Sequence, residues 1–215
     1  RGLGDVYKRQ VQGLTGLEKV SGGKILFNGQ DITKASIRDR SKMGMSHIPE
    51  DRHKHGLVLD YTLEDNMVLQ RYFEPQFVSK AGFLKRKAIR EYANRLIEQY
   101  DVRSGQGPVT VARSMSGGNQ QKAIIARWLV TQPDLLILDE PTRGIDIGTK
   151  TEIQKMVIQL AREQHMSIIF ISSEIDEMTR TCTRLAVLRD RRKVAELTGD
   201  DINSDRVMAA IAGGA

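Results

Sequence analysis

The chain has 215 residues, and its 40% apolar content is enough to bury the core of one domain, with or without a subdomain. No apolar run approaches the roughly 18 residues of a membrane-spanning helix, and the single cysteine excludes an internal disulfide. The formal net charge is +6 at pH 7, but the basic residues are dispersed or share a helix face, and the aromatic residues form no stacking platform. Nucleic acid is therefore not an expected partner.

The first part of the chain gives two different signals. Residues 1–10 show neither helical nor strand periodicity, so we expect a non-native scar or a disordered segment there. Residues 11–215 are expected to form the domain. Its first elements are the end of a helix at 11–16, a strand at 24–27 with a tight turn at Asn28-Gly29, a helix at 37–42 and a strand at 43–48.

Between about 56 and 113 the apolar residues recur at three- and four-residue spacing, and strand signals disappear. The clearest stripe consists of Ile89, Tyr92, Ala93, Leu96, Ile97 and Tyr100. We expect an amphipathic helix that buries this stripe in a helical subdomain. The run Gly105-Gln106-Gly107-Pro108 then breaks the helical pattern.

Residues 135–138 are four consecutive aliphatics between Pro133 and Pro141, which is typical of a buried parallel strand. Asp139 and Glu140 follow directly, at the strand end where open parallel sheets bind ligands. One acid can hold Mg²⁺ through water there, while its neighbour reaches an attacking water. Taken alone, the pattern fits an acidic turn after a core strand equally well.

A glycine-rich turn precedes this strand. Ser116-Gly117-Gly118 would leave two backbone N–H groups unobstructed at a helix N-terminus, where the helix dipole attracts anions. The alternative is a plain serine cap with glycines for the turn. The turn and the acid-ended strand occur in order, about one helix apart, and this combination indicates phosphate chemistry.

Downstream of Asp146 the pattern alternates between helix and strand. The expected elements are a helix with apolar positions from 153 to 160, a buried strand at 167–171, strands at 185–188 and 194–197, and a last helix that Ser204 caps and that runs through Ile211. Strands and helices that alternate with short loops indicate a doubly wound parallel sheet.

From about Gly16 onward the chain resembles the ATP-binding cassette (ABC) ATPases. Residues 116–121 resemble the signature motif, residues 135–140 Walker B and residues 144–146 the D-loop. A narrower resemblance is to the C-terminal cassette of tandem ATPase subunits that serve bacterial simple-sugar importers of the ribose, galactose and galactofuranose kind. The stretches that carry it are Ser-Gly-Gly-Asn-Gln-Gln-Lys at 116–122, Pro-Thr-Arg-Gly-Ile-Asp at 141–146, Ile-Pro-Glu-Asp-Arg at 48–52 and Ile-Ser-Ser-Glu at 171–174.

The resemblance implies an α/β fold of the P-loop NTPase, RecA-like type, with a parallel sheet and an inserted α-helical subdomain at about 56–113. The Walker A loop of the family, which binds phosphate, should lie near the start of this chain. No Gly, four residues, Gly-Lys-Ser/Thr run occurs anywhere in the 215 residues. We therefore expect a partial cassette, truncated at its N-terminus, without Walker A.

In this family ATP lies between Walker A of one cassette and the signature of another. The resemblance thus implies that Ser116, Gly117 and Gly118 contact the γ-phosphate of ATP bound by an N-terminal cassette, and it includes Gln120 among the nucleotide-binding residues. Asp139 would coordinate Mg²⁺ through water, and Glu140 would be the catalytic residue that polarises water.

Three further positions follow from the resemblance. Glu50 falls where most cassettes carry the Q-loop glutamine, which senses Mg²⁺ and contacts the membrane subunit; glutamate keeps an oxygen ligand and adds charge. Ser173 stands where active cassettes carry a switch histidine, and the C-terminal cassettes of the tandem family share this serine pattern. Asp146 belongs to the D-loop.

The implied cofactors are ATP and Mg²⁺. The implied partners are the N-terminal cassette of the same polypeptide, transmembrane permease subunits and, indirectly, a periplasmic or lipoprotein sugar-binding protein. The subunit would lie peripherally on the cytoplasmic face of the inner membrane. Without the Walker A cradle and its lysine, this chain alone is expected to show no appreciable ATPase activity.

Three alternatives stay open. A nucleoside importer is the close competitor of a sugar importer, because the ATPase does not touch the transported molecule. A DNA-repair or chromosome-organising ABC ATPase shares the signature and Walker B, but those proteins insert long coiled coils or zinc modules, whereas this insert is compact and lacks cysteine pairs. A non-catalytic regulatory cassette is the third.

Overall fold

The computed structural model describes residues 5–190 and 192–213. The helices are α1 (Asp5–Thr15), α2 (Ile37–Lys42), α3 (Leu63–Val68), α4 (Arg86–Gln99), α5 (Gly117–Leu129), α6 (Ile147–Glu163), α7 (Ile175–Thr181) and α8 (Ser204–Ala212). The strands are β1 (Leu26–Phe27), β2 (Gln30–Asp31), β3 (Met45–Ile48), β4 (Leu135–Asp139), β5 (Ser167–Ile171), β6 (Arg184–Arg189) and β7 (Arg192–Thr198). Short π- and 3₁₀-helical turns are η1 (Arg52–Gly56), η2 (Gly107–Val109), η3 (Ala112–Ser114) and η4 (Gly199–Asp201).

A three-stranded parallel sheet in the order β3-β4-β5 forms the centre of the molecule. Successive residues of β4 point to opposite faces, so Ile137 packs with Val11 of α1 on one side. Leu136 and Leu138 pack with α5 and α6 on the other side. Helices thus cover both faces of a parallel sheet, and the predicted α/β fold class is confirmed.

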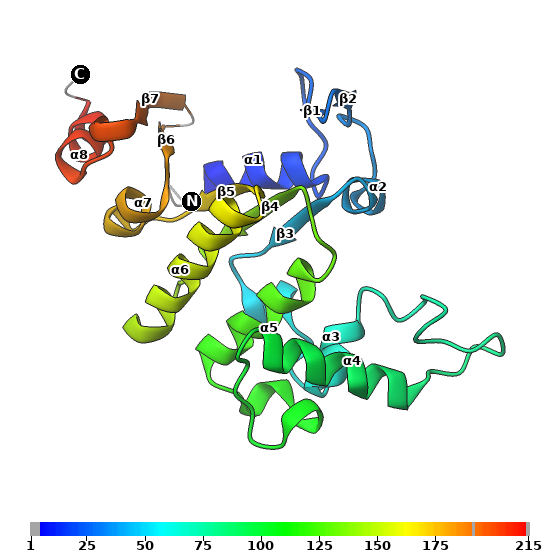
Figure 1. The fold of residues 1–215 in the computed structure, drawn as a ribbon. Helices are drawn as coiled ribbons and strands as arrows, with labels where there is room; N and C mark the ends of the chain where they lie inside the picture. The colour runs from blue at the N-terminus through cyan, green and yellow to red at the C-terminus, as the bar shows by residue number, and fades with distance from the viewer. Residues whose placement is uncertain (1–4, 191, 214–215) are drawn as a thin grey trace.

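Between β3 and β4 the regular elements are helices, joined by turns and loops and accompanied by isolated bridges. Helices α3 and α4 pack against α5, and Figure 1 shows the three grouped on one side of the sheet. The predicted stripe of α4 faces this second core, where Ile89, Tyr92, Ala93 and Leu96 are buried. Because α5 contributes to both cores, it carries the signature turn at the junction between them.

Two local predictions are confirmed closely. Asn28 and Gly29 both have positive φ, 48° and 78°, and they connect the antiparallel strands β1 and β2. Such a pair of left-handed residues matches the twist of a two-residue hairpin. The charged helix expected at 37–42 is α2, and Ser36 caps it by accepting a hydrogen bond from the Asp39 N–H.

Residues 5–10 differ from expectation, because they form the first part of helix α1. The helix is anchored at its other end, where the buried Arg40 side chain donates hydrogen bonds to the carbonyls of Gly13 and Leu14. The last carbonyls of a helix lack donors from a following helical turn, and Arg40 supplies donors from 26 and 27 residues away in sequence. Residues 1–4 lie outside the described part of the chain.

The C-terminal part also departs from the sequence prediction. β6 and β7 pair with each other as an antiparallel hairpin and do not extend the parallel sheet. Figure 1 shows this hairpin with α8 at the end of the molecule away from α3 and α4. The N-cap of α8 is Asn203, whose side chain accepts from the Arg206 N–H, so Ser204 is the first helical residue.

Strand β5 is less buried than its apolar sequence suggests. Phe170 is buried, but Ile169 is 37% exposed. The strand lies at one edge of the three-stranded sheet, so its outer side has no neighbouring strand among the described residues. In the part of the chain that the structure describes, every helix is too short or too polar to cross a lipid bilayer.

Candidate functional site

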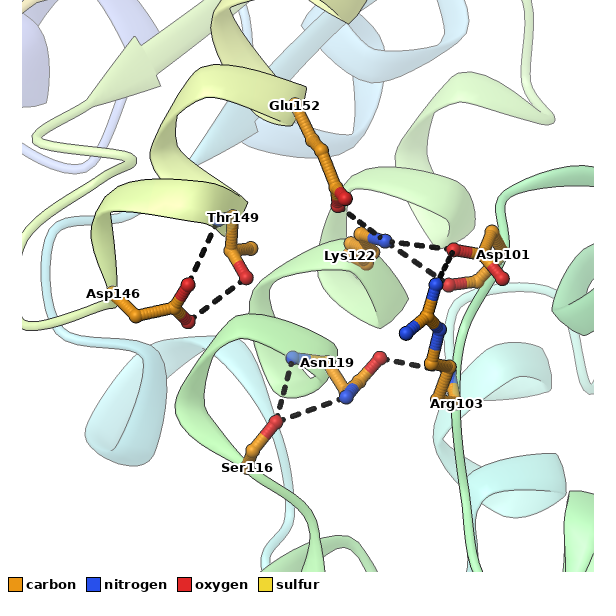
Figure 2. A network of polar contacts seen from close by, with 8 residues as sticks. All are labelled: Asp101, Arg103, Ser116, Asn119, Lys122, Asp146, Thr149 and Glu152. Carbon is orange, nitrogen blue, oxygen red and sulfur yellow. Dashed lines mark hydrogen bonds and ion pairs between the residues drawn. The ribbon is translucent and has the colours of Figure 1, made fainter.

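The signature turn is held by its own side chains. Ser116 is the N-cap of α5, and its Oγ accepts hydrogen bonds from the backbone N–H and the side-chain amide of Asn119, at 3.4 and 2.9 Å. The Asn119 side-chain oxygen in turn accepts from the Arg103 N–H at 2.8 Å. The cap therefore ties the turn to the end of the helical group, as Figure 2 shows.

The two glycines of the turn are required by close packing. An ideal Cβ on Gly117 would lie 2.9 Å from Nη2 of Arg52, and one on Gly118 would lie 2.8 Å from the Thr149 side chain. Thr149 belongs to the first turn of α6, where its N–H and hydroxyl donate to the Asp146 carboxylate. These bonds hold the pKa of Asp146 below its ordinary value. The signature turn thus packs directly against the D-loop helix.

Lys122 adds a link that the sequence did not reveal. Its ammonium lies 3.2 Å from an Asp101 carboxylate oxygen and 2.8 Å from that of Glu152, so α5 joins the end of α4 to α6 (Figure 2). Burial alone would lower the pKa of Lys122, but the hydrogen bonds to Glu152 and Asp101 outweigh it and raise the pKa. A lysine in a helix usually indicates an exposed face, and its two partners come from distant segments.

The acid pair lies where the strand prediction placed it. Asp139 ends β4, opposite Ile171 of β5, and both Asp139 and Glu140 are buried. Glu140 adopts a left-handed φ of 46°, which turns the chain at the strand end. Its Oε1 accepts a hydrogen bond from the Ser173 N–H at 2.9 Å. The Ser173 contact with the acid pair thus comes from the backbone.

Buried Glu177 of α7 connects the two loops that follow β4 and β5. Its Oε2 accepts hydrogen bonds from the hydroxyls of Thr142, at 2.7 Å, and Ser172, at 2.9 Å. Lys150 of α6 forms ion pairs with Glu177 and Glu174. One carboxylate therefore sets the loop that carries Glu140 and the loop that carries Ser173 relative to each other.

Glu50 lies at the loop after β3 and forms an ion pair with Arg143. Glu50 and Asp139 both line an open cavity of about 1060 Å³, which Arg52 and Trp128 also border. Carboxylate oxygens are the donors that Mg²⁺ prefers. Among the described residues no group of three or more His, Cys, Asp or Glu side chains could hold a metal by itself. The donor set therefore fits a cation that takes its other ligands from phosphate and water.

Gln120 makes its side-chain hydrogen bonds within the domain. Its side chain is buried, with Oε1 hydrogen-bonded to His53 Nε2 at 3.0 Å and Nε2 donating to the Ala112 carbonyl at 2.9 Å. The amide therefore joins η1 to the segment before the signature. Of the predicted site residues, only Glu50 and Asp139 line the open cavity, and residues 116–118 lie outside it.

His47 of β3 lines the same cavity, and its Nε2 is shielded from solvent without a hydrogen-bond partner among the described residues. Burial, together with the nearby His55, lowers the pKa of His47 from 6.5 to about 4. Between these values the unfolded chain binds more protons than the folded one. The free energy of unfolding should therefore fall as the pH drops below 6.5, by about 2 kcal/mol at pH 5.

Urea unfolding at pH 7 and pH 5 measures this effect. From pH 7 to pH 5 the free energy of unfolding of the wild type should fall by about 2 kcal/mol through His47. His47→Gln should not show this part of the fall, because glutamine does not titrate. His165→Asn is the matched control, because His165 is exposed with a φ of 53° that asparagine tolerates. Equal pH dependence in wild type and His47→Gln would contradict the assignment.

Comparisons with known proteins show the family to which the chain belongs. A family model described as "ABC transporter" matches residues 11–143. The chain is 46% identical over 180 residues to the nucleoside import ATP-binding protein NupA of Lactococcus lactis subsp. cremoris, covering 84% of this chain and 35% of the relative. It is 39% identical over 211 residues to a putative ribose/galactose/methyl galactoside import ATP-binding protein of Geobacillus kaustophilus, covering 98% and 41%.

The solved structures agree in fold. A nucleotide-free ATP-binding cassette from an ABC transporter superposes with a TM-score of 0.76 at 18% identity, covering 94% of this chain and 79% of that one. A dimeric, post-hydrolysis cassette bound to ADP and Pi gives 0.72 at 16% identity, covering 89% and 80%. The chain spans about two fifths of the length of the curated relatives that it matches. It belongs to the ABC transporter family of ATP-binding cassettes.

Proposed function

We propose that this chain is part of the ATP-binding subunit of an ABC importer that takes up a monosaccharide. The observation that carries the proposal is the separation of two phosphate-related groups within one cassette. Asp139, the first residue of the acid pair, lines a cavity with Glu50, whereas the signature turn lies outside that cavity and packs against the first turn of α6. A turn that does not face its own acids suits a nucleotide presented by a second cassette.

On this proposal Ser116, Gly117 and Gly118 contact the γ-phosphate of ATP held by an N-terminal cassette of the same polypeptide. The helix N-terminus and the bare glycine N–H groups suit an anion. The side chain of Gln120 is already committed to His53 and Ala112, so its part is to shape the turn. Asp146 keeps α6 in place against the turn through its bonds with Thr149.

At the other group, Asp139 and Glu50 would hold Mg²⁺ together with phosphate and water. When bound, the cation neutralises negative charge on the phosphates. Glu140 is positioned by the Ser173 N–H to polarise a water. Ser173 has no imidazole that can become positively charged, so it cannot supply the contact that a switch histidine makes.

The chain alone should not hydrolyse ATP. Its 215 residues contain no Walker A run, and phosphoryl transfer depends on positioning and charge stabilisation by that cradle. A phosphate-release assay on the purified monomer should show no turnover above background. Steady turnover by monomeric material, abolished by Glu140→Gln, would contradict this expectation.

A nucleoside is the second candidate substrate. It is favoured by the 46% identity to the Lactococcus nucleoside import protein and by 37% identity over 210 residues to the guanosine import ATP-binding protein NupO of Bacillus subtilis, which covers 98% of this chain and 41% of that relative. The site geometry does not distinguish the two, because the transported molecule would contact a permease and a periplasmic or lipoprotein binding protein. The subunit itself would sit peripherally on the cytoplasmic face of the membrane.

The importer proposal can be tested with a chimera. The matching segment of the Lactococcus protein is replaced by this chain, and labelled nucleoside uptake is measured in cells that lack the native subunit. Restored uptake supports the proposal, and a folded, membrane-associated chimera without uptake contradicts it. Uptake of labelled ribose, galactose and guanosine by the parent polypeptide with its own permease then identifies the substrate.

A further inference from the structure

The guanidinium of Arg52 lies between the D-loop turn and the signature turn. Arg52 begins η1, directly after the loop that carries Glu50. Its Nη1 donates to the carbonyl of Arg143 at 2.9 Å and its Nη2 to the carbonyl of Gly144 at 3.4 Å. On the other side, Nη2 would be 2.9 Å from a Cβ on Gly117, so the cation rests against the bare α-carbon of this glycine.

A second contact runs between the same two segments in the opposite direction. The Arg143 side chain forms an ion pair with Glu50, two residues before Arg52. The loop 50–52 and the turn 143–144 are thus joined in two ways, through two backbone acceptors and through one carboxylate. The two contacts can be removed separately, because substituting Arg143 leaves its carbonyl in place.

The chemistry of Arg52 suits a positioning role. Among the described residues it forms no ion pair with a carboxylate, and its Nε is buried without a hydrogen-bond partner. Its acceptors are two successive backbone carbonyls, which the planar fork of a guanidinium can reach together. A lysine has no such fork and can serve one acceptor well at most in this geometry.

We propose that Arg52 is a positioning residue that holds the D-loop turn, residues 143–146, at a fixed place against the signature turn, residues 116–118. Its effect on turnover rests on the proposed function, since both turns would face a nucleotide held by a second cassette. Its effect on the structure of the D-loop turn is independent of the proposed function. Loss of the fork should loosen residues 143–146 and leave the rest of the domain folded.

The first experiment measures amide hydrogen exchange of the 215-residue chain by mass spectrometry. In Arg52→Gln, peptides covering residues 141–149 should exchange at least about tenfold faster than in wild type, because the turn loses both donors. Arg52→Lys should fall between the two, and Arg143→Ala should have a smaller effect. The control is Arg184→Gln, which removes an exposed arginine of β6 that pairs with Glu196. Unchanged exchange at 141–149 in Arg52→Gln, with the fold intact by circular dichroism, overturns the inference.

The second experiment measures ATP hydrolysis by the chimera with its permease. Arg52→Gln should lower kcat by about tenfold and change KM for ATP by less than about twofold, because the two turns meet the nucleotide only in the closed, reacting state. Equal kcat in variant and wild type overturns the catalytic consequence. A chimera that is inactive even as wild type refutes the proposed function instead, and the exchange experiment then decides the role of Arg52 by itself.

Discussion

Gly118→Ala is expected to reduce uptake by the chimera about 100-fold. A shift of about 1 Å in a group that positions the reacting atoms has an effect of this size. The ideal alanine Cβ would lie 2.8 Å from both Oγ1 and Cγ2 of Thr149 and 3.1 Å from its Cβ. Thr149 cannot rotate away freely, because its hydroxyl donates to the Asp146 carboxylate at 2.9 Å. Either the signature turn or the first turn of α6 must shift.

The same substitution should lower the free energy of unfolding by about 1 to 2 kcal/mol. Overpacking at a tight contact costs about 1 to 3 kcal/mol, and the better helix propensity of alanine returns part of it. Urea unfolding of the 215-residue chain measures the change. The effect on stability is modest beside the effect on uptake, so the two readouts separate misplacement of the turn from simple unfolding.

Two variants sharpen the test. Gly105→Ala adds the same methyl group to a nearby glycine with nothing within 4 Å of its ideal Cβ, and it should leave uptake unchanged. Thr149→Ala removes the two atoms at 2.8 Å, so Gly118→Ala combined with Thr149→Ala should lose less stability than the sum of the single changes. Additive losses would show that the clash with Thr149 is not the cause.

The sequence predicted what local periodicity encodes. Four aliphatics between two prolines identified β4, the spacing of Ile89, Tyr92, Ala93 and Leu96 identified α4, and the Asn28-Gly29 pair identified the first hairpin. The helix N-terminus at residues 116–118 was also predicted from local sequence, and the serine cap, which the sequence offered as the alternative reading, is present because the capping group and the N–H it accepts from are three residues apart. Each of these signals lies within one element or one turn.

The contacts that position the site could not be predicted from the sequence, because they join residues that lie far apart in the chain. Arg52 donates to carbonyls 91 and 92 residues away, and Glu177 accepts from a hydroxyl 35 residues away. No local pattern marks Lys122 or Arg40 as buried, although both are buried against backbone or acidic partners. The sequence predicted β6 and β7 as strands but not their antiparallel pairing, since a strand pattern does not say which strand lies beside it.

Residues 5–10 illustrate how tertiary context extends an element. We identified no helical pattern in these residues, yet they form the first part of α1. Further along the same helix, Val11 packs against Met45 of β3 and Ile137 of β4. Helix formation is cooperative, so a segment next to a well-anchored turn can propagate it at little cost. Arg40 provides that anchor at the C-terminal end of α1 through the carbonyls of Gly13 and Leu14.

Glu177→Ala is expected to lower the free energy of unfolding by about 3 kcal/mol, which corresponds to a fall in Tm of about 6 to 12 °C for a chain of this size. The carboxylate is 4% exposed and accepts from Thr142, which is 1% exposed, and from Ser172. Without it, a buried hydroxyl loses its acceptor and Lys150 loses one of its two acidic partners. Removal of one partner from a buried polar cluster costs more than the cluster contributes when intact.

Glu177→Gln separates hydrogen bonding from charge in this cluster. Glutamine keeps an oxygen acceptor for the two hydroxyls and loses the ion pair with Lys150, whose ammonium is 3.8 Å from Oε1. If the hydroxyl bonds dominate, Glu177→Gln should cost less than about 1.5 kcal/mol. Glu163→Ala at the exposed end of α6 is the control and should change Tm by less than about 2 °C. A Glu177→Gln variant as unstable as Glu177→Ala would instead assign the stabilisation to the charge, and the loops after β4 and β5 would then be held together through Lys150.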